Sequence, residues 1–124
     1  MKKSPQGGGR RRKIESELQR VLAELIAREV KDPRVGNVTI TGVSLAADMS
    51  AAKIFYAPFA AMHPQAEVHS GLSRAAGFLR GEVGRRLGLR HAPRLDFVFD
   101  DTAEKAARLT GLIDRAVADD RKDN

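Results

Sequence analysis

The fold is decided by residues 38–56, which read VTITGVSLAADMSAAKIFY. Apolar and polar residues alternate over 38–41 and again over 43–45, but in opposite phase, and Gly42 stands where the phase changes. This slip predicts a β-strand with a bulge or bend at Gly42. After a polar turn, the run 52–56 predicts a second strand, so the whole stretch is typical of an antiparallel hairpin.

An amphipathic helix is predicted before the hairpin. Apolar residues recur at helical spacing from Ile14 to Val30, which is the apolar stripe of a helix with one buried face. We expect this helix to span about 10–31, because the residue before Pro33 is pushed out of the α region.

A second helical stripe, from Val68 to Leu87, is interrupted by glycines. Each interior glycine costs about 0.8–1.0 kcal/mol relative to alanine, so we expect this helix to be kinked or split. A straight helix would also place Arg86 at the angle of Val68, on the apolar face. A bend at Gly77 removes that conflict.

The C-terminal part of the chain predicts one more strand and one more helix. Residues 95–99 alternate as a strand does, and 101–104 resemble a capping box that opens a helix. The predicted order is α-β-β-α(kinked)-β-α, an α+β domain with helices packed on one face of a three-stranded sheet. The apolar stripe of the last helix comprises Ala106, Leu109, Thr110, Ile113, Ala116 and Val117.

Composition limits the classes of protein to consider. The chain has 124 residues, enough for a single core, and lacks cysteine, which excludes disulfides and Cys-based metal sites. Neither a secretory signal nor a membrane-spanning stretch is found, so we expect a cytoplasmic protein. We expect a disordered basic extension over 1–9, one domain over 10–117 and a charged flexible tail over 118–124.

Positive charge is concentrated in two segments. The net charge is +6, yet residues 1–13 alone carry +6 and residues 74–94 carry +5, while the rest is acidic. Such patches favour a polyanionic partner, because Lys and Arg release counterions from phosphates when they bind. With five Phe, one Tyr and no Trp, we expect phosphate and shape recognition to dominate over base stacking. The candidate phosphate-binding residues are Arg10, Arg11, Arg12, Lys13, Arg74, Arg80, Arg85, Arg86 and Arg90.

Signals for catalysis or metal binding are weak. His63, His69 and His91 lack the spacing of a metal cluster, and Asp100-Asp101 stand where a helix cap is expected. The run 81–84 matches the GxxG of KH domains, but Val83 falls on the apolar stripe, which favours a helix interior. We therefore expect no enzyme activity, no cofactor and no metal.

Several runs together resemble the ribosome-binding factor A family. The runs 30–35 (VKDPRV), 38–43 (VTITGV) and 48–54 (DMSAAKI) match its K-D-P-R-V, V-T-I-T-x-V and D-(L/M)-S-x-A-K-(V/I) motifs. The runs 75–80 (AAGFLR) and 87–97 (LGLRHAPRLDF) match A-x-G-F-(I/L)-R and L-x-L-R-x-x-P-x-L-x-F. Their order and spacing hold over about 10–117.

This resemblance implies a type II KH-like fold in which a kink at Ala75, Ala76 and Gly77 replaces the usual GxxG loop. It further implies a monomer that binds the free small (30S) ribosomal subunit and its 16S RNA, possesses no catalytic centre, and assists late maturation, including 5′-end processing and cold adaptation. From the residues alone, a general nucleic-acid chaperone and a basic protein-interaction module stay open as alternatives.

Overall fold

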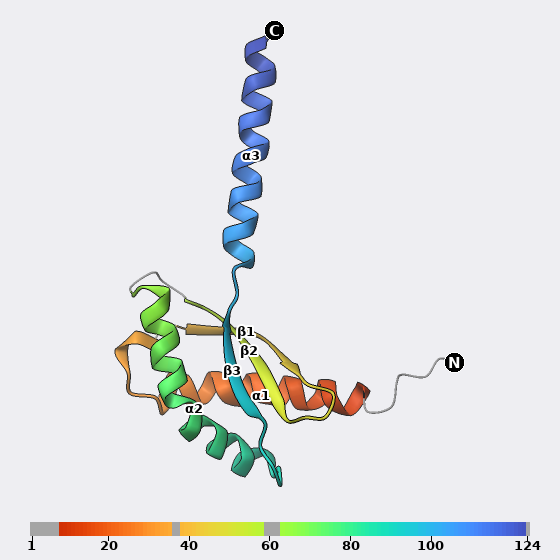
Figure 1. Ribbon diagram of the computed structural model, residues 1–124, viewed down its shortest axis with the longest axis vertical. Helices are drawn as coiled ribbons and strands as arrows, with labels where there is room; N and C mark the ends of the chain where they lie inside the picture. Colours follow the sequence, from red (N-terminus) through yellow and green to blue (C-terminus); the bar gives the residue numbers. More distant parts are fainter. Residues whose placement is uncertain (1–7, 36–37, 59–62, 124) are drawn as a thin grey trace, which may run out of the picture.

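The computed structural model describes residues 8–35, 38–58 and 63–123, with side chains as far as Leu112. The predicted α+β class and order of elements are confirmed, with a short 3₁₀ turn (η1) added after the first helix (Figure 1). The elements are α1 (Gly8–Arg28), η1 (Pro33–Val35), β1 (Val38–Leu45), β2 (Ala51–Pro58), α2 (Gln65–Leu87), β3 (Arg94–Phe99) and α3 (Thr102–Asp123).

The three strands form one mixed sheet in the order β1-β2-β3. β1 and β2 form the predicted antiparallel hairpin, whereas β3 runs parallel to β2, with α2 as the crossover between them. The register shifts between Ile40 and Gly42, which confirms the bulge. Gln19 of α1 donates its side-chain N–H to the Ile40 carbonyl at 3.0 Å, so the bulge is also where α1 is tied to the sheet.

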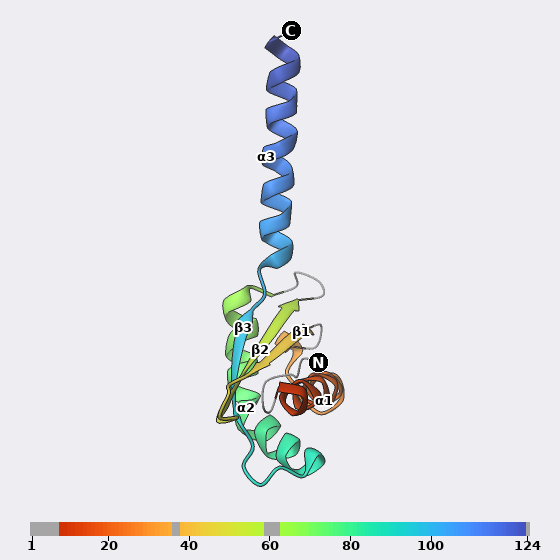
Figure 2. The same cartoon turned by 90° about the vertical axis from the view of Figure 1, so that its right-hand side faces the viewer.

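Helices α1 and α2 cover one face of this sheet, and the core lies between them and the strands (Figure 2). On β2, Ala52, Ile54 and Tyr56 are buried, while Lys53 between them is exposed on the other face, as strand geometry requires. The helices contribute the leucines of the predicted stripes to the same core: Leu18, Leu22 and Leu25 from α1, and Leu72 and Leu79 from α2.

Helix α2 is one continuous helix whose axis changes direction near its middle (Figures 1 and 2). This agrees with the predicted kink, whose assignment to Ala75, Ala76 and Gly77 stays a prediction. The helix ends at Gly88, which has a φ of 64°, a left-handed conformation that glycine adopts without a Cβ penalty. The Leu89 N–H then donates to the Gly84 carbonyl at 2.9 Å and turns the chain towards β3.

Helix α3 does not pack on the sheet, which corrects the expectation that all helices would do so. It extends away from the body of the molecule (Figures 1 and 2), and every side chain from Thr102 to Thr110 is exposed. Leu109 and Leu112 are 59% and 56% exposed. Of the predicted stripe, the side chains of Ile113, Ala116 and Val117 lie outside the described residues. The described apolar residues of α3 therefore contribute nothing to the core.

The start of α3 is fixed by Asp100 rather than by the predicted capping box. The Asp100 carboxylate accepts the Thr102 N–H at 2.9 Å and the Thr41 hydroxyl of β1 at 2.6 Å, and the hydrogen bonds from Thr102 and Thr41 hold its pKa at about 2. The Asp101 side chain pairs instead with Lys105 at 3.6 Å. The interpretation as a helix cap is therefore confirmed for Asp100 only, and the capping carboxylate is one position earlier than in the predicted capping box.

The helix bounds in the structure differ from the predicted domain boundaries at both ends of the chain. α1 begins at Gly8, inside the segment 1–9 that we expected to be disordered, and residues 1–7 lie outside the described residues. α3 continues to Asp123, through most of the expected flexible tail 118–124. Over the residues that the structure describes, no helix is long and apolar enough to span a membrane.

Candidate nucleic-acid interface

A groove of about 570 Å³ lies between the C-terminal half of α2 and the loop that leads to β3. Its helix side is lined by Gly77, Gly81 and Gly84, and its loop side by residues 89–92. Three arginines, Arg80, Arg85 and Arg90, also line the groove and give it positive charge. The groove combines positive charge with a helix surface that has no side chains at three positions.

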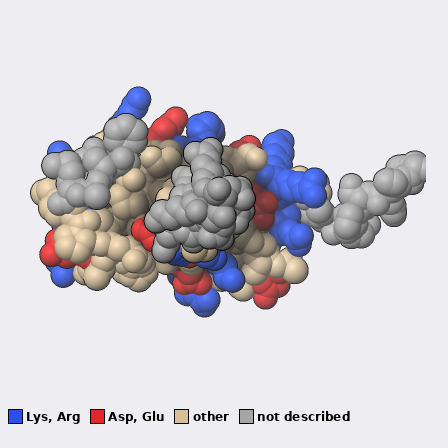
Figure 3. Space-filling model, turned by 90° about the horizontal axis from the view of Figure 1, so that it is seen from above, with Lys and Arg blue, Asp and Glu red and all other residues tan. Residues whose placement is uncertain are grey.

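A second groove, of about 310 Å³, joins the start of α1 to the end of α2. Its α1 side is lined by the cations Arg10 and Lys13 together with Ile14 and Glu17, and its other side by residues 87–89. Leu89 lines both grooves, so the two basic segments, which are far apart in the sequence, meet at one end of the molecule. Figure 3 shows Lys and Arg side chains gathered where α1 begins. We call this surface the basic end; its groove-lining cations are Arg10, Lys13, Arg80, Arg85 and Arg90.

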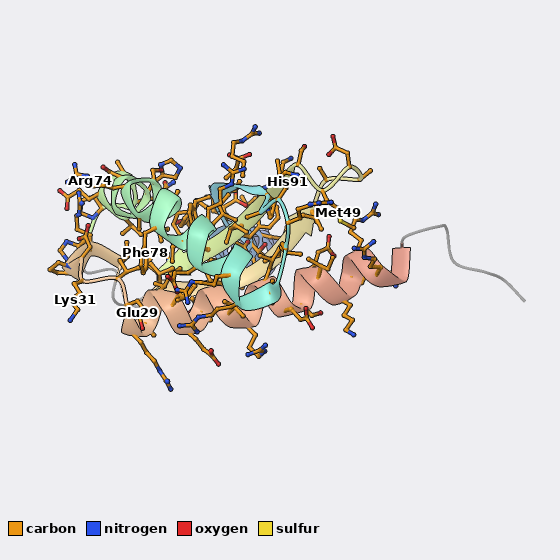
Figure 4. All side chains as sticks on the ribbon, turned by 90° about the horizontal axis from the view of Figure 1, so that it is seen from below. Glu29, Lys31, Met49, Arg74, Phe78 and His91 are labelled. Carbon is orange, nitrogen blue, oxygen red and sulfur yellow. The ribbon has the colours of Figure 1, made fainter. Side chains whose placement is uncertain are left out.

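The other candidate residues fall at different distances from the basic end. Arg11 and Arg12 share the first turns of α1 with Arg10, and Arg86 follows Arg85 on α2. Arg74 lies elsewhere. In Figure 4 it lies at the same end of the body as Lys31, away from the start of α1, and its positive charge helps to lower the pKa of Asp32.

Arg80 has a structural contact that its sequence position did not indicate. Its Nε and Nη2 atoms both donate to the Ala92 carbonyl oxygen, at 3.0 and 2.9 Å. The guanidinium thus holds the loop that closes one side of the groove. Arg80 shapes the groove as well as contributing charge to it.

Glu82, the acid within the arginine-rich segment 74–94, is neutralised by its neighbours. Arg85 forms a hydrogen-bonded ion pair with its carboxylate, and Arg86 lies 3.8 Å from it. Two cations around one carboxylate leave a net positive charge. The repulsion that Glu82 would otherwise exert on a phosphate is therefore reduced.

The turn before β1 forms a separate charged cluster. Arg34 donates from its side chain to the Asp32 carboxylate, with the closest contact at 2.6 Å, and its backbone N–H adds a further hydrogen bond at 3.0 Å. These bonds hold the pKa of Asp32 at about 2. Gly71 of α2 lies against this turn, with only 3.1 Å between the position of an added Cβ and the Asp32 Oδ2 atom. The K-D-P-R-V run thus fixes α2 and is not itself part of the basic end.

The GxxG run 81–84 lies inside α2, with Val83 fully buried, so the prediction of a helix interior is confirmed. Its glycines nevertheless face the groove. Among the histidines, the His69 Nε2 atom hydrogen-bonds to the Phe97 carbonyl at 3.1 Å and His63 lies 3.5 Å from Glu67. Within the described ranges, no group of three or more acidic or His residues could hold a metal ion.

Sequence reasoning missed one exposed aromatic residue. Phe78 of α2 is 47% exposed, although we expected base stacking to be unimportant. The signal was present in the helix periodicity, because Phe78 lies about 100–140° from the apolar positions Leu79, Leu72 and Val83 around an ideal helix. It follows Arg74 by one turn, on the charged side of the helix.

Comparisons with known proteins agree with this architecture. The family model "Ribosome-binding factor A" matches residues 10–113. A ribosome-binding factor A from Thioalkalivibrio sulfidiphilus is 50% identical over 94% of this chain and 91% of its own length. The crystal structure of ribosome-binding factor A from Thermus thermophilus superposes with a TM-score of 0.64 at 31% identity, over 71% of this chain and 93% of that one.

A second structural neighbour is a homology model of the Thermus thermophilus factor fitted into the cryo-EM map of a 30S complex. It has a TM-score of 0.59 and 32% identity, over 71% of this chain and 92% of that one. With the fold, the family model and the sequence identity in agreement, the chain belongs to the ribosome-binding factor A family.

Proposed function

We propose that this chain binds the free small ribosomal subunit and assists late maturation of its 16S RNA, including processing of the 5′ end and growth in the cold. Family membership supports subunit binding, since the related Thermus factor was fitted into a map of a 30S complex. This action takes place in the cytoplasm and needs no catalytic residue of the chain. The protein acts as a monomer that holds an immature RNA conformation.

The meeting of two basic segments at one end of the fold is the observation that carries the proposal. Arg10 and Lys13 from α1 and Arg90 from the loop after α2 line adjoining grooves. Cations on a rigid scaffold are suited to phosphates held at a fixed spacing, which is how a protein recognises the shape of a folded RNA. Arg85 and Arg86 add net charge beside them.

Charge reversal at these three residues tests the proposal. The variant carries Arg10→Glu, Lys13→Glu and Arg90→Glu, which avoids the structural bond of Arg80 and the ion pairs of Glu82. A matched control carries Lys53→Glu, Lys105→Glu and Arg108→Glu, three exposed cations on the open sheet face and on α3. Both variants change the net charge equally.

Sedimentation with free small subunits, full ribosomes and unrelated RNA at physiological salt gives the readout. We expect the wild type and the control to migrate with free small subunits, and the groove variant to stay at the top of the gradient. Equal binding of the wild type to every RNA would support a general nucleic-acid chaperone instead. Binding to no RNA would support a protein-interaction module.

The processing role has its own test. Cells that lack the chain are expected to accumulate small-subunit RNA with an unprocessed 5′ end, most strongly in the cold, as measured by primer extension. Complementation by the control variant but not by the groove variant would connect that defect to the basic end. Normal 5′ ends in the deletion strain would refute the processing role while leaving subunit binding intact.

A further inference from the structure

We propose that Phe78, the exposed aromatic residue in the middle of α2, is a stacking platform for one unpaired RNA base. The inference rests on the proposed function, because it names the part of the RNA that the surface recognises. An unpaired base requires a single-stranded or looped segment, so the protein would read a flexible region of the RNA as well as its phosphates.

The first observation is the exposure of the ring. Within the described ranges, Phe78 is the one aromatic side chain among the exposed large apolar residues, at 47%. Tyr56 and Phe97 are buried in the core. Other residues of α2 pack in the core, whereas the Phe78 ring remains exposed to solvent. The ring is therefore available to a binding partner.

The second observation is the lack of side chains at two glycines beside Phe78. Gly77 precedes Phe78 and Gly81 lies one turn after it, and a Cβ atom built at either glycine would meet nothing within 4 Å. Both glycines also line the arginine-lined groove. A base stacked on Phe78 would therefore meet no side chain at these two neighbouring positions of the helix.

The third observation is the charge around the ring. Arg74 precedes Phe78 by one turn and Arg85 follows it by two, and both lie within about 40° of it around an ideal helix. Glu82, one turn after Phe78, is held by Arg85 and Arg86. Arginines on either side of an exposed aromatic ring match the alternation of phosphate and base along a single strand.

The same surroundings argue against a protein as the occupant. A protein hot spot usually combines an aromatic anchor with other apolar contacts. Here the nearest positions along the helix face are Arg74, Ala75, Gly81, Glu82 and Arg85, and the only apolar side chain among them is the methyl group of Ala75. Figure 4 shows Phe78 and Arg74 as labelled side chains of α2, well apart from Met49 and His91.

A tryptophan at position 78 provides a direct test, because the chain contains no other Trp. Phe78→Trp in the full-length protein is titrated with a short oligouridylate, a short oligoadenylate and a blunt RNA duplex. We expect saturable quenching by both single strands and little change with the duplex. An emission that stays unchanged both with the single strands and with free small subunits would overturn the stacking role.

Affinity measurements on two further variants separate stacking from simple apolar contact. Phe78→Tyr keeps the aromatic face and should bind free small subunits like the wild type. Phe78→Leu should weaken binding by roughly 5- to 150-fold, the effect expected for loss of one stacked base. Leu112→Ala, an equally exposed apolar residue on α3, serves as the matched control, and all variants should unfold at the wild-type temperature.

The two proposals fail in different ways. If the wild type does not bind small subunits, the proposed function fails, and the tryptophan titration still decides the stacking role. If the wild type binds and Phe78→Leu binds equally well, only the stacking role is refuted.

Discussion

Gly71 is the residue at which α2 meets the turn 32–35. An added Cβ would lie 3.0 Å from the Val35 Cγ1 atom, and Val35 is fully buried and cannot move aside. We expect Gly71→Ala to lower the free energy of unfolding by about 1–3 kcal/mol, the usual cost of overpacking. Urea denaturation followed by circular dichroism measures this change.

Gly81→Ala is the matched control, because the same substitution on the same helix meets open space. Alanine has the higher helix propensity, so this variant should gain up to about 1 kcal/mol. A loss of stability at position 81 similar to that at 71 would show that the cost comes from the bend of α2 and not from contact with Val35.

Asp32 makes the stability of the fold sensitive to acid. Its hydrogen bonds with Arg34 lower its pKa in the folded state from 3.8 to about 2. A carboxyl group whose pKa is lowered by folding stabilises the protein above its unfolded-state pKa, and this contribution is lost as the pH falls through the folded-state value. We therefore expect the unfolding temperature to fall as the pH is lowered from about 4 to 2.

Asp32→Asn isolates this contribution, because asparagine keeps an acceptor for the Arg34 N–H but carries no charge. The variant should be less stable than the wild type at neutral pH, and the difference should shrink as the pH approaches the folded-state pKa of about 2. Thermal melts at a series of pH values give the comparison. A difference that is constant over that range would mean that the charge of Asp32 does not contribute.

At the scale of the element, α3 differs most from the other helices because its described side chains have no partner in the core. Leu109 and Leu112 are more than half exposed, whereas Leu79 of α2 is fully buried. We expect Leu109→Ala and Leu112→Ala to change the free energy of unfolding by less than about 0.5 kcal/mol. Leu79→Ala should cost about 2–5 kcal/mol. A large cost at Leu109 would mean that α3 packs on the domain in solution.

The example of α3 shows what a helical stripe can and cannot predict. Period and spacing predicted α1, the bulge at Gly42 and the strand 95–99, because those patterns record which residues face the same side. The apolar stripe of a helix does not show which part of the molecule, if any, packs against that face. The prediction that the last helix packs on the sheet was wrong for that reason.

The prediction of the candidate site from the sequence had the same limit, because a sequence pattern does not show which segments lie side by side in the fold. Charge counting found the two basic segments, yet only the fold shows that α1 and the end of α2 meet at Leu89. The bond from Arg80 to the Ala92 carbonyl joins residues twelve apart, beyond any helical period. The position of Arg74 apart from the grooves likewise depends on tertiary structure, since in sequence it belongs to the same basic segment.

At the scale of the whole molecule, the net charge of +6 makes any RNA binding sensitive to salt. The logarithm of the binding constant falls linearly with the logarithm of the salt concentration, with a slope of about 0.7–0.9 for each phosphate that the protein neutralises. This slope counts phosphate contacts, and so it can distinguish residues that touch the RNA from residues that only add to the overall charge.

Replacing Arg10, Lys13 and Arg90 by glutamine should therefore reduce the slope for small-subunit binding by about 2–3. Replacing Lys53, Lys105 and Arg108 by glutamine lowers the net charge equally but should leave the slope close to that of the wild type, because these residues lie outside the grooves. Filter binding over a range of salt concentrations measures both slopes. If the slope were reduced equally in the two variants, the overall electrostatic field of the protein would attract the RNA. The basic end would then not be a defined contact surface.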